Sequence, residues 1–129
     1  MKIKIQEHVG FLEVVTSGQA DPANWDEVHS TVFTHPSYVP GCKLLVDHQQ
    51  LEMAHLSSED VQAIASLSRA RKDSFGKSLM AILVSRDVDF GLVRMWEAYA
   101  STDLERKVMV FRDREKAVAW LEEPEDPQE

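Results

Sequence analysis

Hydrophobic and polar residues alternate at the start of the chain, which is the pattern of strands with one buried face. Ile3 and Ile5 share one side of "KIKIQEH", and "GFLEVVTS" follows after Val9 and Gly10, so the short link predicts an antiparallel hairpin. "CKLLVD" and "KSLMAILVS" are apolar almost throughout, as strands covered on both faces are, and the second is expected to lie centrally. "RKVMVF" is the fifth predicted strand.

The segments between these strands show the apolar spacing of helices. In "DPANWDEVHSTVFTH", Asp21 is a candidate N-cap, Pro22 suits the first helical position, and the helix ends before Pro36. Further helices are predicted from about Ser57, over "DVDFGLVRMWEAYAS" and over "DREKAVAWLEE". The order β-β-α-β-α-β-α-β-α predicts an α/β fold, a mixed sheet of about five strands with four helices, in which the strands after the hairpin pair in parallel.

Length and charge indicate one acidic domain. The 129 residues suit a single domain over 1–121, followed by "EEPEDPQE", an acidic disordered tail over 122–129. The net charge of -8 argues against nucleic acid as a partner, and five of the 22 acidic residues lie in that tail.

Cysteine usage and the absence of long apolar runs indicate a cytoplasmic protein. Cys42 is the single cysteine, so the chain forms no internal disulfide and no thiolate metal cluster. The first residues lack the apolar core of a signal peptide, and no run approaches the roughly 20 residues of a membrane span. We expect no stable membrane insertion.

The stretch "MAHLSSEDVQAIASL" carries a helix start signal. With Ser57 as N-cap, Asp60 falls three residues later and completes a capping box, while Leu56 and Val61 form a hydrophobic staple. Glu59 and Asp60 also lie where the helix dipole favours acids. The bare sequence therefore predicts a structural role for the serine pair.

Three longer stretches carry a family resemblance: "KLLVDHQQLEMAHLSSEDV", "FGLVRMWEA" and "KVMVFRDREKAVAWL". In these, the chain resembles the STAS superfamily, and more closely its branch similar to stage II sporulation protein AA, the SpoIIAA-like branch of small bacterial proteins. The resemblance spans nearly residues 1–121 and implies a STAS-like (SpoIIAA-like) fold.

The resemblance also implies a second role for Ser57 and Ser58. In STAS anti-sigma-factor antagonists, a kinase phosphorylates a serine at the start of the corresponding helix, within a pattern like Asp-Ser-Ser-Gly. Here Leu56 stands in place of the Asp and Glu59 in place of the Gly, and the acids beside the serines would repel a phosphate. Ser57 and Ser58 are candidate phosphoacceptors, and the helix cap is the favoured interpretation.

Polar residues after the third and fourth predicted strands form a candidate partner or ligand surface. Asp47, His48 and His55 follow the third strand, with Met53 between them, and they either converge there or form a polar loop. Asp87 follows the fourth strand and Arg94 lies one turn into the next helix. That pair is either capping with a surface ion pair or a binding site for an anionic group.

These patterns lack a catalytic constellation, a phosphate loop or the spacing of a metal site, so no cofactor or metal is predicted. The leading hypothesis is a non-enzymatic cytoplasmic regulatory or protein-interaction module, with a protein partner or a homodimer contacting the segment 47–58. It predicts a filled core and an exposed apolar patch near that segment.

The alternative hypothesis is a carrier of a small apolar or lipid-like ligand. It predicts a cavity of roughly 300 Å³ or more, lined by aromatic side chains and by Met53, Met80 and Met95. The SpoIIAA-like branch also resembles the CRAL-TRIO lipid-binding fold, which implies that "HQQLEMAHL" would be a mobile lid.

Overall fold

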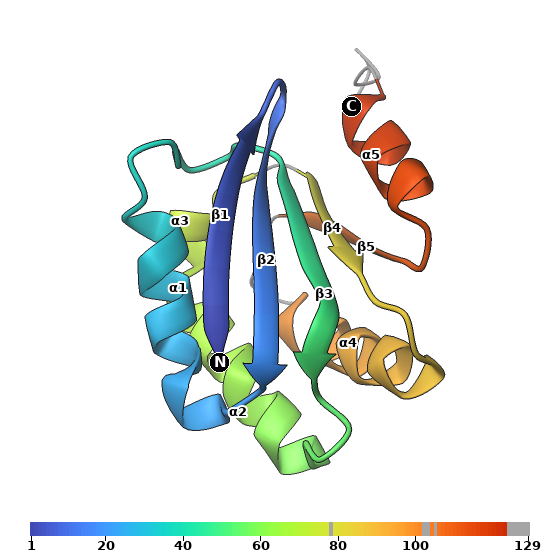
Figure 1. The fold of residues 1–129 in the computed structure, drawn as a ribbon. Coiled ribbons are helices and arrows are strands. Elements are labelled where there is room, and N and C mark those ends of the chain that lie inside the picture. Colours follow the sequence, from blue (N-terminus) through green and yellow to red (C-terminus); the bar gives the residue numbers. More distant parts are fainter. Residues whose placement is uncertain (78, 102–103, 105, 124–129) are drawn as a thin grey trace.

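The computed structural model describes residues 1–77, 79–101, 104 and 106–123 of the chain. Five strands form one sheet in chain order (Figure 1), and its hairpin is antiparallel whereas the other neighbours pair in parallel. The predicted mixed α/β fold is confirmed. The strands are β1 (Lys2–His8), β2 (Phe11–Gln19), β3 (Leu44–Glu52), β4 (Leu79–Leu83) and β5 (Lys107–Phe111).

The helices exceed the predicted number, because the described residues form five α-helices and a 3₁₀ turn. The turn η1 (Pro22–Asn24), capped by Asp21, precedes α1 (Trp25–Phe33). The additional helix is α3 (Lys72–Phe75), a four-residue turn whose Phe75 is buried. The others are α2 (Ser58–Ala70), α4 (Asp87–Ala100) and α5 (Arg114–Glu122), so Glu122, expected in the tail, ends a helix, and 124–129 lie outside the described residues.

The helices form two unequal layers. Because β2 to β5 lie side by side in chain order with parallel neighbours, crossovers of one hand place α1, α2 and α4 on the same face of the sheet. The final helix α5 is not a crossover and packs on the opposite face, against β3, β4 and β5. The middle strand is β3, whereas the more apolar β4, expected at the centre, lies between β3 and β5.

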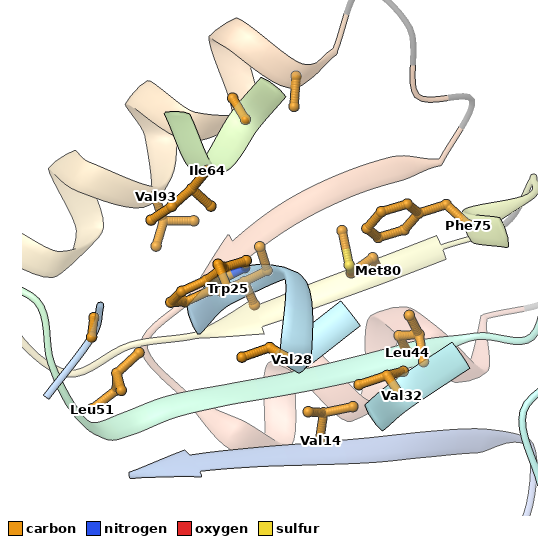
Figure 2. Close-up of a cluster of buried hydrophobic side chains, with 14 of the residues drawn as sticks. Val14, Trp25, Val28, Val32, Leu44, Leu51, Ile64, Phe75, Met80 and Val93 are labelled. Carbon is orange, nitrogen blue, oxygen red and sulfur yellow. The ribbon is translucent and has the colours of Figure 1, made fainter. Parts of the chain in front are cut away.

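Alternate residues of the inner strands supply two separate cores. In β3, Leu44 belongs to the larger core and Leu45 to the smaller one, and in β4 Met80 and Ala81 divide in the same way. This division explains why the first three residues of β3 and all of β4 are apolar. The larger core, shown in Figure 2, joins the sheet to α1, α2 and α4 through Trp25, Val28, Ile64 and Val93. The smaller core receives Ala117 and Leu121 of α5.

A β-bulge extends β3 beyond its predicted end at Asp47. Val15 pairs with Asp47 but Ser17 pairs with Gln50, so β3 carries one more residue than β2 across this interval. The extra residue returns Leu51, 0% exposed, to the larger core, and Met53 and Leu56 are buried behind it. The expected loop and mobile lid over "HQQLEMAHL" is therefore wrong: its first five residues belong to β3.

A buried carboxylate ties α5 to the sheet. Glu13 of β2 is 2% exposed, and Arg114 at the start of α5 donates two hydrogen bonds to it, at 2.6 and 2.7 Å. His8 Nε2 lies 2.7 Å from the same carboxylate. The hydrogen bonds from Arg114 outweigh desolvation and lower the pKa of Glu13. The pair fixes where α5 begins on the sheet.

Removing the guanidinium of Arg114 tests how much its pairing with Glu13 contributes to the stability of the fold. Arg114→Ala leaves Glu13 buried beside His8 alone, and we expect the free energy of unfolding to fall by about 1–2 kcal/mol. Breaking a fully buried ion pair costs ~3–5 kcal/mol, and the loss here is smaller because Arg114 is half exposed to solvent. Because the folded-state pKa of Glu13 is lowered, this stability is present at neutral pH and lost as pH falls below about 4.5. Urea unfolding at pH 7 and pH 4 measures both effects. Lys116→Ala, on an exposed position of the same helix, is the control, and an equal loss there contradicts the assignment.

Candidate ligand-binding site

A small cavity lies between the sheet and the helices α1, α2 and α4. Its volume is about 100 Å³, and most of its lining is apolar. An apolar cavity of ~150 Å³ is enough for benzene, so the structure has room for a few carbon atoms, and a larger ligand requires lining side chains to move. Flexible methionines make such movement easy. The aromatic and sulfur-containing lining residues are Trp25, Phe33, Phe75, Trp96, Met53 and Met80.

Neither hypothesis from the sequence described this interior fully. The carrier hypothesis expected a cavity of roughly 300 Å³ or more, and the observed cavity is smaller. The interaction-module hypothesis expected a filled core, and the core is not completely filled. Met53 and Met80 line the cavity as the carrier hypothesis predicted, whereas Met95 packs at the edge of the larger core.

Four polar residues interrupt the apolar lining: Thr16, His29, His48 and Ser68. All four are buried, and no Asp, Glu, Lys or Arg of the described chain joins them in the lining. An ionic ligand would therefore lose its hydration without meeting an opposite charge. The lining is suited to an uncharged molecule.

The first polar pair is Thr16 and His48, on the strands that flank the bulge. Thr16 Oγ1 lies 2.6 Å from His48 Nδ1 and 3.2 Å from the carbonyl oxygen of Asp47. The imidazole meets Trp25 edge to face, with ring centroids 5.9 Å apart. The alternation of β3 runs from Leu44 and Val46 to His48, so a histidine stands in the wall of the cavity where the bulge begins.

The second polar group joins the helices. Ser68 Oγ of α2 donates to the Ile64 carbonyl at 3.1 Å, accepts from Trp96 Nε1 of α4 at 3.2 Å, and lies 3.4 Å from His29 Nε2 of α1. His29 Nδ1 is enclosed and has no hydrogen-bond partner among the described residues. The serine thereby links three helices over the larger core.

Burial keeps both histidines neutral. Desolvation lowers the pKa of His48 to about 4, and it lowers the pKa of His29 to about 4 against the opposing effect of Asp26. At neutral pH neither imidazole carries the positive charge that an anionic ligand needs. Their uncharged rings offer only hydrogen bonds to a ligand.

The residues of the predicted surface do not come together. Asp47 and His48 point to opposite faces because successive side chains of a strand alternate. Asp47 Oδ1 accepts from the Gln49 amide at 2.9 Å, and a ring nitrogen of the exposed His55 lies 2.6 Å from the Ala20 carbonyl. Of the two alternatives for Asp47, His48 and His55, the structure does not show convergence, and of the surface set only His48 and Met53 reach the cavity.

The acid and the arginine of α4 form separate surface ion pairs. Asp87 pairs with Arg112, and Arg94 Nε lies 3.4 Å from Glu97 Oε1, so the two do not build a shared anion site. Asp89, in the first turn of the same helix, is fully buried and accepts from Arg86 at 2.8 Å. Within the described ranges, no group of three or more His, Cys, Asp or Glu side chains is placed to hold a metal ion.

The predicted capping box at Ser57 is confirmed. Ser57 Oγ accepts from the Asp60 amide at 3.1 Å, and Asp60 Oδ2 accepts from the Ser57 amide at 2.9 Å. The staple residues Leu56 and Val61 are both buried in the larger core. Phosphorylation of Ser57 or Ser58 stays a prediction.

Sequence reasoning missed three cavity residues, although each follows the spacing of its apolar neighbours. Thr16 continues the alternation of Leu12 and Val14 in β2. Ser68 lies one turn after Ile64, and His29 one turn after Trp25. A polar residue inside an apolar stripe was the available signal.

Comparison with known proteins defines the class of fold. No protein-family model and no curated protein matches the chain. Among solved structures, its fold is SpoIIAA-like, as the resemblance implied. A similar structure is that of an uncharacterized protein of the DUF3478 family, with a SpoIIAA-like fold, from Shewanella loihica PV-4. The two chains are 17% identical, with a TM-score of 0.59 over 93% of this chain and 92% of that one, a likeness of fold alone. No helix in the described ranges is long and apolar enough to cross a membrane.

The capping box makes a prediction about stability. Ser57→Ala removes the acceptor of the Asp60 amide and should lower the free energy of unfolding by about 1 kcal/mol in urea unfolding. Ser58→Ala, the exposed neighbouring serine at the first helical position, should change it by less than about 0.5 kcal/mol. Equal losses in the two variants would show that the cap is not the cause.

The buried histidines predict a dependence of stability on pH. Each has a folded-state pKa of about 4 against an ordinary value of 6.5, so the unfolded chain binds more protons between these values. Stability should fall as pH drops from about 6.5 towards 4, by on the order of 3 kcal/mol per histidine. His48→Phe should flatten this slope in urea unfolding across the range. Leu44→Met, the control, should change the free energy of unfolding equally at every pH and leave the slope unchanged. Parallel curves of unfolding free energy against pH for wild type and His48→Phe would refute the prediction.

Proposed function

We propose that this chain is a non-enzymatic domain that binds a small, largely apolar molecule between its sheet and the helices α1, α2 and α4. The observation that carries the proposal is the apolar cavity in the larger core, whose polar lining residues are uncharged. Structural cavities of this kind are unfavourable for the empty protein, because lining atoms lack contact partners on one side. Filling the space would restore those contacts.

The energetics favour a compact ligand. Each CH₂ group that leaves water for an apolar site contributes about 0.8 kcal/mol, so even a few carbon atoms provide useful affinity. Met53 and Met80 lie in the wall and have several rotatable bonds, so they allow the space to adjust to different shapes. We infer that the site accepts molecules somewhat larger than the cavity volume in the absence of ligand.

The non-enzymatic part of the proposal rests on the dispersal of the titratable groups. Asp47 and His48 lie on opposite faces of β3, and Asp87 and Arg94 bind different partners at the surface. General acid–base or nucleophilic chemistry needs such groups within hydrogen-bond reach of one another. We place the domain in the cytoplasm on the evidence of its sequence.

The regulatory or protein-interaction hypothesis stays a prediction. It expected an exposed apolar patch near the segment 47–58. The large apolar side chains that the described residues expose fall outside this segment and apart from one another in the sequence: Val9, Val39, Val88, Tyr99 and Met109. The cavity has the more specific observation in its favour.

Binding of toluene to the folded protein tests this proposal. Toluene should shift the methyl NMR signals of residues that line the cavity, such as Val14, Val28 and Ile82, and should raise the unfolding temperature in a saturable way. Val46→Phe places a ring in the cavity wall and should abolish both effects. The NMR measurement is made on the folded variant, so a modest loss of stability from overpacking does not obscure the result.

Val118→Phe is the matched control, because Val118 of α5 packs against the smaller core on the other face of the sheet. That variant should bind toluene as the wild type does. Shifts confined to surface residues, or unchanged binding by Val46→Phe, would refute a site in the cavity.

A further inference from the structure

The two histidines in the cavity wall differ in how their nitrogen atoms are satisfied. His29 Nδ1 is enclosed by protein atoms, and its Nε2 lies against Ser68. His48 uses Nδ1 for Thr16, and its Nε2 has no hydrogen-bond partner among the described residues. Within the described ranges, the side-chain atoms that are both shielded from solvent and without a hydrogen-bond partner are His29 Nδ1 and Asp89 Oδ1. His48 Nε2 has no partner but is not one of these shielded atoms, so a water-sized molecule reaches it. Of the two cavity histidines, His48 is therefore the one with an accessible nitrogen that has no hydrogen-bond partner.

The direction of the Thr16 hydroxyl proton determines whether His48 Nε2 donates or accepts a hydrogen bond. Its single proton has two neighbouring acceptors, His48 Nδ1 at 2.6 Å and the Asp47 carbonyl oxygen at 3.2 Å. If the proton lies toward His48 Nδ1, then Nε2 carries a hydrogen and donates. If the proton lies toward Asp47, then Nδ1 donates to Thr16 and Nε2 accepts. A ligand that both donates and accepts is satisfied in either arrangement.

We propose that the molecule bound in this cavity carries a hydroxyl group, as small alcohols and phenols do, and that His48 Nε2 is the group that binds it. A hydroxyl is the smallest group that both donates and accepts, and the cavity has little space to spare. This inference rests on the proposed binding function and names its ligand class.

The surroundings of His48 support the assignment. Thr16 and Trp25 hold the ring in one orientation, and the alternation of β3 that directs Leu44 and Val46 to the cavity directs His48 there as well. The β-bulge begins beside His48, and bulges are frequent next to functional sites. A carboxylate ligand would meet a neutral imidazole and no cation in the lining, so its desolvation would go uncompensated.

The test compares phenol, toluene and benzoate, which have similar rings and different substituents, in wild type and in two variants. His48→Phe keeps a ring in the wall and leaves the Thr16 hydroxyl its Asp47 acceptor. We expect this change to weaken phenol at least about tenfold, because the buried hydroxyl loses its partner, and to alter toluene by less than about twofold. Val118→Phe, on the other face of the sheet, is the control and should leave the ratio of phenol to toluene affinity within about twofold of wild type. Benzoate should not bind.

The ¹⁵N NMR signals of the histidine rings give a second readout on the unaltered protein. Phenol should shift the Nε2 signal of His48 while toluene leaves it in place, and this result would support the proposal even if a variant fails to fold. Equal phenol-to-toluene ratios in wild type and His48→Phe, or tight binding of benzoate, would overturn the hydroxyl assignment and leave cavity binding standing. Failure of both phenol and toluene to bind would overturn the proposed function and this inference together.

Discussion

The β-bulge between β2 and β3 is the constraint on which the larger core depends. Three residues of β3 advance past two of β2 after the pair Val15 and Asp47, so the side-chain alternation shifts by one position. His48 on one side of the shift and Leu51 on the other therefore both face α1, α2 and α4. Without that shift, the end of β3 would direct Leu51 to the opposite face and leave the larger core without it.

The remaining structure is asymmetric about the sheet for a topological reason. Because the strands lie in chain order and their crossovers have the same hand, three helices lie on one face of the sheet. The other face is covered by α5. On the face of α5, the buried hydrophobic residues of the inner strands are Phe11, Leu45, Ala81 and Leu83. The carboxylate of Glu13 is buried at the margin of the smaller core, and its pairing with Arg114 offsets the cost of its desolvation.

Much of the fold could be predicted from the sequence because local patterns and tertiary packing agree. The alternation of Ile3 and Ile5, the apolar run of β4 and the box formed by Ser57 with Asp60 each indicated the element that forms. The end of β3 could not be predicted, because a bulge breaks the period of two on which strand recognition rests. The helix α3 was missed because four residues are too few to show helical spacing.

The site was only partly predictable, and for a different reason. His48 and Met53 were among the candidates, but they were grouped with Asp47 and His55 because these residues follow one strand. Only geometry shows that Asp47 faces the other side. Thr16, His29 and Ser68 are polar residues inside apolar stripes, and an ordinary satisfied core residue gives the same signal as a polar cavity wall.

The central claim is that the larger core is a binding site for a small uncharged molecule, and mass spectrometry of the protein purified from its own cells tests it most directly. Spectra are recorded under native and then denaturing conditions on one sample. The account predicts a low-mass adduct that is present in the native spectrum and lost on denaturation. A bare chain in both spectra, or an adduct that survives denaturation and maps to Ser57 or Ser58, would contradict it.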